Sequence, residues 1–189
     1  ARILFSLCAL LAVPAYGGEP DVAWVERSRA LADQLMSELK AELGQAMQQG
    51  GPVAAVAVCK SRAPQIAARL SASSGADVGR TAIRWRNPAN APDDLERAVM
   101  QGFAAELSSA LPATTAPPEA IFESRSAQGT ERLYLRAIIM QPVCLACHGA
   151  TLTPELATII AREYPQDAAT GFETGQLRGA VTVRWPVTR

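Results

Sequence analysis

The chain has 189 residues, and its 18 Lys and Arg balance 18 Asp and Glu, so the formal net charge is zero. This balance gives no reason to expect nucleic acid or an anionic membrane surface as a partner. Apolar residues make up 49% of the chain, which is enough for one packed core.

Residues 1–20 are typical of a secretory signal peptide. Arg2 precedes the apolar run 3–13, and small residues follow from Ala15. The run is too short to span a bilayer as a helix. We therefore expect an exported, periplasmic protein with no stable membrane insertion after cleavage. Residues 21–189 are then expected to form a single domain.

The first half of the mature chain is predicted to be mostly helical. Apolar side chains recur at helical spacing over residues 21–48, and Gly50-Gly51-Pro52 ends that helix. A second helix starts near Pro52 and carries Cys59 on its apolar face. Pro64 has no N–H and would crowd the carbonyl of Lys60, so this helix is predicted to break or kink just after Cys59.

The rest of the chain alternates short strands and helices, separated by polar or proline-containing segments. We predict, in chain order, a polar loop over 71–79, a strand over 81–85, a proline-bounded turn over 86–92, a helix from Asp93 or Asp94 to 108, a hairpin of strands 120–126 and 131–139, a helix over 154–164 and a strand over 179–185. This order is typical of an α+β domain in which helices flank an antiparallel sheet.

The most informative stretch follows the predicted hairpin. Cys144-Leu145-Ala146-Cys147-His148 has the spacing C-x-x-C-H and contains the only histidine. This spacing is the attachment site of a c-type haem, in which both cysteines form thioethers and the histidine becomes an axial iron ligand. We therefore predict one covalently attached haem c, bound by Cys144, Cys147 and His148, with His148 ligating the iron. The opposite axial ligand is not a second histidine of this chain.

Two other cysteine chemistries compete with haem. Cys59, Cys144, Cys147 and His148 add up to a Cys3His zinc set, but the adjacent Cys147 and His148 would have difficulty facing one metal. A thioredoxin-like pair expects a strand before the motif within a βαβ unit. The signal peptide favours haem, because c-type haem is attached outside the cytoplasm in bacteria.

A cytochrome c-prime-like helical bundle is the alternative fold, since its motif also lies near the C-terminus. It leaves the predicted hairpin and the final strand unexplained. A small class I cytochrome c usually has a Met ligand downstream of the motif, and no Met follows His148.

Several separated segments of the chain are similar to a known family. They are Val-Ala-Val-Cys-Lys around Cys59 with Ala-Pro-Gln-Ile-Ala just after it, Arg-Asn-Pro-Ala-Asn-Ala-Pro-Asp from Arg86, Pro-Val-Cys-Leu-Ala-Cys-His-Gly from Pro142, and Tyr-Pro from Tyr164, Ala-Thr-Gly-Phe from Ala169 and Leu-Arg-Gly-Ala from Leu177. Together they resemble the c-type haem-binding domains with a PAS-like fold, formerly a domain of unknown function. The resemblance runs from about residue 25 to 187. Such domains occur as stand-alone periplasmic proteins and as sensory portions of histidine kinases.

This resemblance implies a PAS-like antiparallel sheet flanked by helices, with a long N-terminal helix. It also implies an iron ligated by a histidine and by a cysteine upstream of the motif, which maps to Cys59. From the residues alone, Cys59 fits a buried structural cysteine equally well. Lys60 and Arg62 flank it, and we prefer two solvated side chains over contacts with a thiolate or with haem propionates.

The methionines are the rival axial ligands. Met36, Met47 and Met100 fit apolar helical stripes, so core packing is the preferred interpretation. Met140 is only four residues before Cys144, which places it on the wrong approach for the far face of the haem.

A thiolate ligand stabilises Fe(III) and gives a low reduction potential relative to His/Met ligation. Its release would open a coordination position for NO or CO. We therefore expect a redox or diatomic-gas sensor that works by ligand change and passes its signal to an unidentified protein partner. The alternative is an electron-transfer cytochrome with an unidentified redox partner. A peroxidase needs a distal acid or base and no second histidine is present, so we expect no enzymatic activity.

Overall fold

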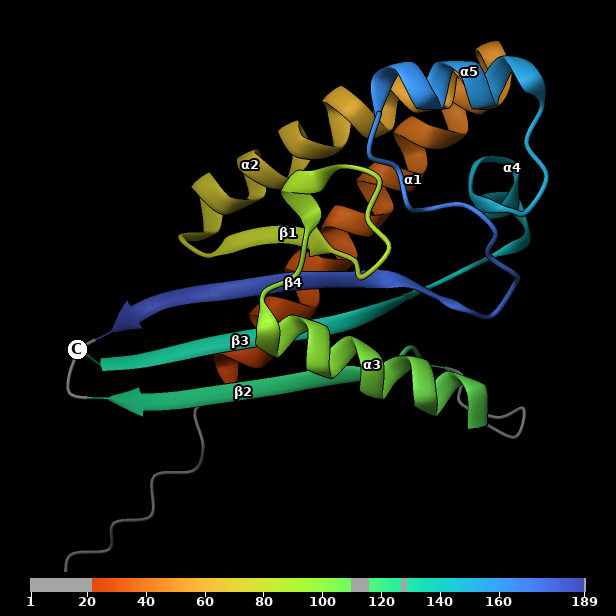
Figure 1. Ribbon diagram of the computed structural model, residues 1–189. Helices are drawn as coiled ribbons and strands as arrows, with labels where there is room; N and C mark the ends of the chain where they lie inside the picture. Colours follow the sequence, from red (N-terminus) through yellow and green to blue (C-terminus); the bar gives the residue numbers. More distant parts are fainter. Residues whose placement is uncertain (1–21, 110–115, 127–128, 189) are drawn as a thin grey trace, which may run out of the picture.

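The computed structural model describes residues 22–109, 116–126 and 129–188. The predicted signal peptide, 1–20, lies outside the described residues, as do positions 127 and 128 of the predicted hairpin turn. The elements in chain order are α1 (Ala23–Ala57), the π-helical segment η1 (Val58–Arg62), α2 (Ala63–Ser74), β1 (Asp77–Thr81), the 3-10 turn η2 (Pro88–Asn90), α3 (Asp94–Ser109), β2 (Glu119–Ser126), β3 (Gly129–Ile139), the 3-10 turn η3 (Pro142–Cys144), α4 (Leu145–His148), α5 (Pro154–Glu163) and β4 (Leu177–Thr188) (Figure 1).

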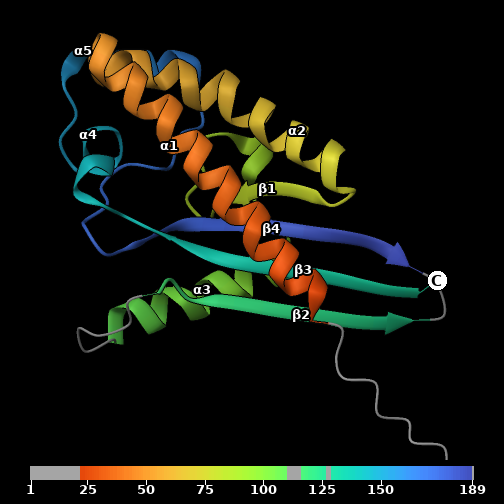
Figure 2. The same cartoon turned by 180° about the vertical axis from the view of Figure 1, so that it is seen from behind.

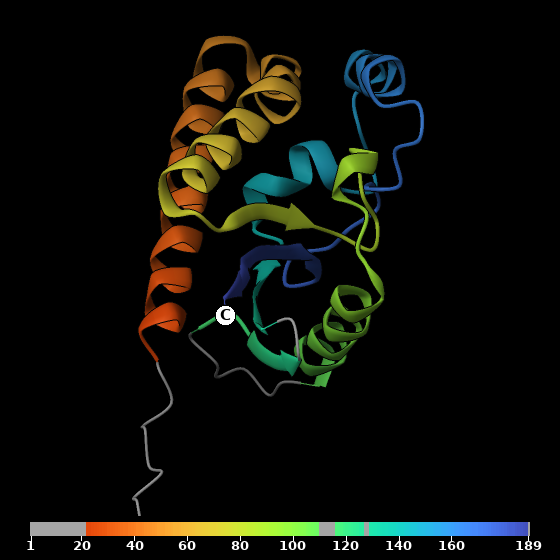
Figure 3. The same cartoon turned by 90° about the vertical axis from the view of Figure 1, so that its left-hand side faces the viewer.

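The four strands form one antiparallel sheet in the order β1-β4-β3-β2. Helices α1 and α2 lie on one side of the sheet and α3 lies on the other (Figure 3). The predicted α+β, PAS-like fold with a long N-terminal helix is therefore confirmed. The cytochrome c-prime-like bundle is wrong as a fold, because the helices pack on a sheet rather than only on one another.

The core is divided between the two faces of the sheet by the alternation of strand side chains. Tyr134 of β3 and Val183 of β4 pack in the α1 and α2 cluster. The neighbouring Leu133 and Leu135 pack against Met100 and Phe103 of α3. Both faces of the sheet are thus covered by helices.

Helix α1 turns back on itself at Gly50-Gly51. Its last residues, together with η1 and α2, form a second arm that runs antiparallel to the first in a helical hairpin. Gly50 (φ −154°, ψ 17°) and Gly51 (φ +64°, ψ −158°) leave the helical conformation, so the predicted end of the first helix is confirmed. The two arms lie side by side in Figures 2 and 3. An ion pair joins Glu42 to Arg62 at 2.6 Å, and a second joins Glu38 to Arg69.

Replacing Gly51 by alanine is expected to destabilise the protein by about 1–3 kcal/mol, because its backbone region is essentially restricted to glycine. Gly44 is the matched control. It is helical, and a Cβ there meets nothing within 4 Å, so Gly44→Ala should stabilise by about 0.5–1 kcal/mol. Equilibrium urea unfolding measures both free energies. Changes of the same sign would contradict the assignment of the reversal to Gly51.

Pro64 does not break the second helix, which corrects one of the two outcomes predicted just after Cys59, a break or a kink. The chain stays helical and widens into a π turn over Val58–Arg62, in which the Ala63 N–H donates to the Val58 carbonyl. A π turn widens the spacing of the helical hydrogen bonds, and this relieves the missing N–H and the crowded carbonyl that Pro64 imposes. Cys59 therefore lies inside the π turn.

Two further boundaries differ from the predictions. The polar segment after residue 70 continues α2 to Ser74, because Ser71 bonds both the Ala67 carbonyl (3.0 Å) and the Val78 N–H (2.9 Å). The helix then ends at Gly75, which has φ +76°. The strand consequently spans Asp77–Thr81 rather than 81–85. Within the described ranges, no helix is long and apolar enough to cross a bilayer.

Candidate functional site

The C-x-x-C-H motif occupies a short irregular segment between β3 and α5, beyond the end of the sheet (Figure 1). Cys144 ends η3, and Cys147 and His148 lie in α4. Both thiols are half-buried and free. Cys144 packs beside the cluster of Met140, Ala169 and Phe172, whereas Cys147 packs beside a different cluster around α5. The motif therefore joins two small apolar clusters.

His148 is oriented by a backbone hydrogen bond. Its Nδ1 lies 2.7 Å from the Ala169 carbonyl oxygen. A carbonyl oxygen only accepts, so Nδ1 carries the proton and Nε2 keeps its lone pair for a metal. Burial, followed by the charges of Arg178 and Arg86, lowers the pKa of His148 to about 3. The ring is therefore neutral at physiological pH, as a ligand to iron must be.

Arg86 fixes the loop that bears Ala169 to the motif. Its guanidinium pairs with Asp167 at 3.0 Å and donates to the carbonyls of Cys147 (2.8 Å) and Ala169 (3.1 Å). The side chains of Arg86 and Asp167 are only 7% and 9% exposed. Sequence reasoning missed both residues as part of the site, although Arg86 opens one of the segments that carry the family resemblance.

Cys59 lies beside the motif although it is far from it in sequence. Val56, three residues before Cys59, packs with Tyr164 and Cys147. Electrostatics agree with this placement. The pKa of the Cys147 thiol is raised first by burial and then by the charge of Cys59. The same two causes raise the pKa of Tyr164 to about 12.

The two cations that flank Cys59 in sequence are exposed and form ion pairs with carboxylates. Lys60 forms an ion pair with Glu163 of α5, and Arg62 pairs with Glu42 of α1. Both are exposed side chains, in agreement with the preferred interpretation. The Lys60 pair also connects the π turn to α5, so it helps to position Cys59.

Three of the four rival methionines, Met36, Met100 and Met140, pack in or against apolar clusters. Met100 is fully buried against the sheet under α3. Met140 is buried against Ala169 and Phe172, on the side of His148. Met36 packs at the margin of the α1 and α2 cluster.

The donor set fits a haem better than a zinc ion. In the part of the chain that the structure describes, no three His, Cys, Asp or Glu side chains converge as metal ligands. Zinc in structural sites requires four such donors around one point. A porphyrin supplies four donors of its own, so it needs only two axial protein ligands and the two thiols that attach it. His148, Cys59, Cys144 and Cys147 are the residues that would hold such a group.

A PAS-like domain with a C-x-x-C-H motif at one end of its sheet and an upstream thiol beside it is the class of protein that this fold and site define. The sequence model of the Tll0287-like family matches residues 20–186. This chain belongs to the Tll0287-like family, which confirms the resemblance described above.

One solved structure supports the same assignment. The crystal structure of the cyanobacterial haem protein Tll0287 matches with a TM-score of 0.60 and 25% sequence identity, over 91% of this chain and 99% of that one. A comparison with curated protein sequences gave no match.

Proposed function

We propose that this chain is a periplasmic haem c protein that senses redox state or a diatomic gas through a change of axial ligand, and that it is not an enzyme. One haem c is attached through Cys144 and Cys147, with His148 and Cys59 as axial ligands. The observation that carries the proposal is that the charge of Cys59 acts on the Cys147 thiol, next to a His148 ring whose Nε2 is free for a metal. The family and the haem-protein relative support it.

The bound haem would supply one-electron redox chemistry and an exchangeable axial position. His148 is the permanent ligand, because its ring is fixed by Ala169 and by the loop that Arg86 holds. A hydrogen bond donated by the ring nitrogen that does not bind the metal sets the tautomer and the orientation of a ligating histidine.

Cys59 is the exchangeable ligand. It lies in a π turn, a conformation that often occurs at functional sites. The π turn contacts the α5 segment through the Lys60–Glu163 ion pair and follows Val56, which packs on α5. Release of Cys59 would therefore alter the contacts of the π turn with α5 and with the helical hairpin. These elements are the natural route for a signal to a protein partner.

Covalent attachment is tested by expressing the chain in a host that matures c-type cytochromes. The intact protein should gain the mass of one haem that survives denaturation. Cys144→Ala with Cys147→Ala should lose covalent haem almost completely, whereas Cys59→Ala should retain it, because thioethers form only at the motif. A colourless wild-type protein, or haem lost equally from the Cys59 variant, would overturn the assignment.

Optical spectra of the ferric and ferrous states then separate two functions. Sensing by ligand change predicts a loss of Cys59 ligation in one of the states. Six-coordinate spectra with the same ligands in both states would instead indicate electron transfer.

A further inference from the structure

Two half-buried arginines near the site form no ion pair with a carboxylate of the described residues. Arg80 of β1 and Arg178 of β4 are both half-buried. Within residues 22–109, 116–126 and 129–188, no Asp or Glu oxygen forms an ion pair with either guanidinium. Arg86, which is buried, is neutralised by Asp167. Of these three partly or fully buried arginines, only Arg86 thus has a carboxylate partner among the described residues.

Arg80 lies on the side of the site that carries Cys59. Its backbone is in register with Val181, and cross-strand partners place their side chains on the same face of a sheet. Val181 packs in the same cluster as Val58, the residue before Cys59. Burial lowers the pKa of the Arg80 guanidinium, and the charge of Cys59 acts on it in the opposite direction.

Arg178 lies on the side that carries His148. Its guanidinium is 5.6 Å from the centroid of the Phe172 ring, and that ring is 6.3 Å from the His148 ring in an edge-on contact. Its Nη1 donates to the carbonyl of Arg84 at 3.1 Å. The pKa of Arg178 is lowered to about 10, first by burial and then by the charges of Arg86 and Arg80.

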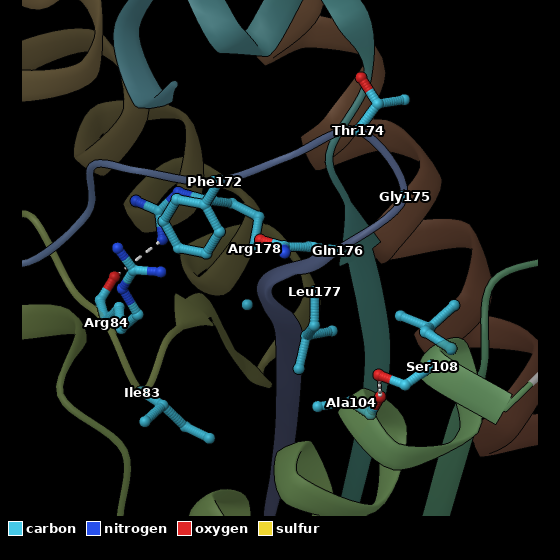
Figure 4. A pocket seen from close by; sticks show the side chains of 12 residues that line it. Ile83, Arg84, Ala104, Ser108, Phe172, Thr174, Gly175, Gln176, Leu177 and Arg178 are labelled. Carbon is cyan, nitrogen blue, oxygen red and sulfur yellow. Dashed lines mark hydrogen bonds between the residues drawn. The ribbon is translucent and has the colours of Figure 1, made fainter. Parts of the chain in front are cut away.

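Arg178 also borders open space, although Cys59, Cys144, Cys147 and His148 do not line it. Arg178 lines a cavity of about 450 Å³ between α3 and the segment that leads into β4. Figure 4 shows Arg178 and Arg84 around Phe172 at the edge of this cavity. Arg84 is exposed and already donates to the carbonyls of Ala168 and Thr170. Water can solvate the charge of the exposed Arg84, whereas the charge of the half-buried Arg178 is less well solvated.

A partly buried cation without an anion is costly, so a functional anion is expected beside each guanidinium. Guanidinium binds carboxylate with two parallel hydrogen bonds, which makes it the preferred partner of that group. A haem c carries two carboxylates, its propionates, and the two unpaired arginines lie beside the two axial residues.

We propose that Arg80 and Arg178 bind the haem propionates, one arginine to each. The inference rests on the proposed function. From sequence, only Lys60 and Arg62 were considered for this role, and two solvated side chains were the preferred interpretation. Those two are paired with Glu163 and Glu42 instead.

The test uses the haem-bearing protein and the variants Arg80→Gln and Arg178→Gln, with Arg69→Gln as the matched control. Arg69 is an exposed arginine of α2 paired with Glu38. In resonance Raman spectra, each of the two variants should shift a propionate bending band, and the control should shift none. Each variant should also lower the reduction potential, because removal of a nearby cation favours Fe(III).

Arg80→Lys and Arg178→Lys keep the charge but lose the paired hydrogen bonds. They should restore most of the potential while the propionate band stays shifted. These conservative variants also keep the test meaningful if a glutamine variant folds poorly. A crystal structure of the haem-bearing wild type should show a guanidinium nitrogen within hydrogen-bond distance of each propionate.

Three outcomes overturn the proposal. A wild type without attached haem overturns it together with the proposed function. A haem-bearing wild type whose propionate bands do not respond to Arg80→Gln or Arg178→Gln overturns it alone. So does a response confined to the iron–sulfur vibration, which would mean that the cations compensate Cys59 rather than the propionates.

Discussion

Cys59→Ala is expected to remove the thiolate signature of the ferric protein while leaving the haem attached. The thiolate donates electron density to Fe(III) and holds it low-spin, so its loss leaves one axial position to water or to no ligand. Ferric EPR and absorption spectra should change from a low-spin thiolate type to a high-spin type. The reduction potential should rise by on the order of 0.1 V, a fraction of the roughly 0.8 V range that axial ligands cover.

Ser61→Ala is the matched control for the Cys59 substitution. Ser61 lies in the same π turn, but its hydroxyl bonds only the Ala57 carbonyl of its own helix at 2.8 Å. It should leave the spectra and the potential unchanged. If Cys59→Ala also leaves the ferric spectrum unchanged, Cys59 is not a ligand and the sensing mechanism proposed above is wrong.

Arg86→Met is expected to destabilise the protein by about 3–5 kcal/mol, since it leaves the buried Asp167 carboxylate without its counter-charge. The carbonyls of Cys147 and Ala169 lose a donor in the same step. For a chain of this size the midpoint of thermal unfolding should fall by roughly 10 °C. Circular dichroism on the haem-bearing protein measures this change.

Two further variants show whether the buried pair is the cause. Arg69→Met removes an exposed, paired arginine and should cost at most about 1 kcal/mol. Arg86→Met combined with Asp167→Leu removes the stranded carboxylate and should recover part of the lost stability. An Arg86→Met protein no less stable than Arg69→Met would show that the pair does not hold the loop that orients His148.

The local elements were predictable where their signals are local. The predicted helix over 154–164 is capped by Thr153, which accepts from the Leu156 N–H. The predicted turn over 86–92 is closed locally by Asn87, which accepts from the Ala89 N–H. Strands β2 and β3 also lie close to their predicted ranges. The π turn was not predictable in the same way, because Pro64 requires only that the regular helix be disturbed and does not specify how.

The site divides in a similar manner. The roles expected of Cys144, Cys147 and His148 follow from their spacing, which covalent chemistry requires whatever the surrounding fold. The pairing of Arg86 with Asp167 joins residues far apart in the chain, and no pattern in either segment indicates the other. The same holds for Arg80 and Arg178, whose lack of a carboxylate partner is a property of the folded molecule.

By itself the sequence determined a fold of the α+β type and a C-x-x-C-H motif that predicts haem attachment, while the family resemblance implied Cys59 as the candidate second ligand. Only the tertiary structure decided that Cys59 lies in a π turn near enough to Cys147 for its charge to act there, that Ala169 and Arg86 orient His148, and which cations remain unpaired. The reason is physical. Attachment chemistry and helix or strand periodicity depend on neighbours along the chain, whereas burial, charge pairing and ligand orientation depend on neighbours in space.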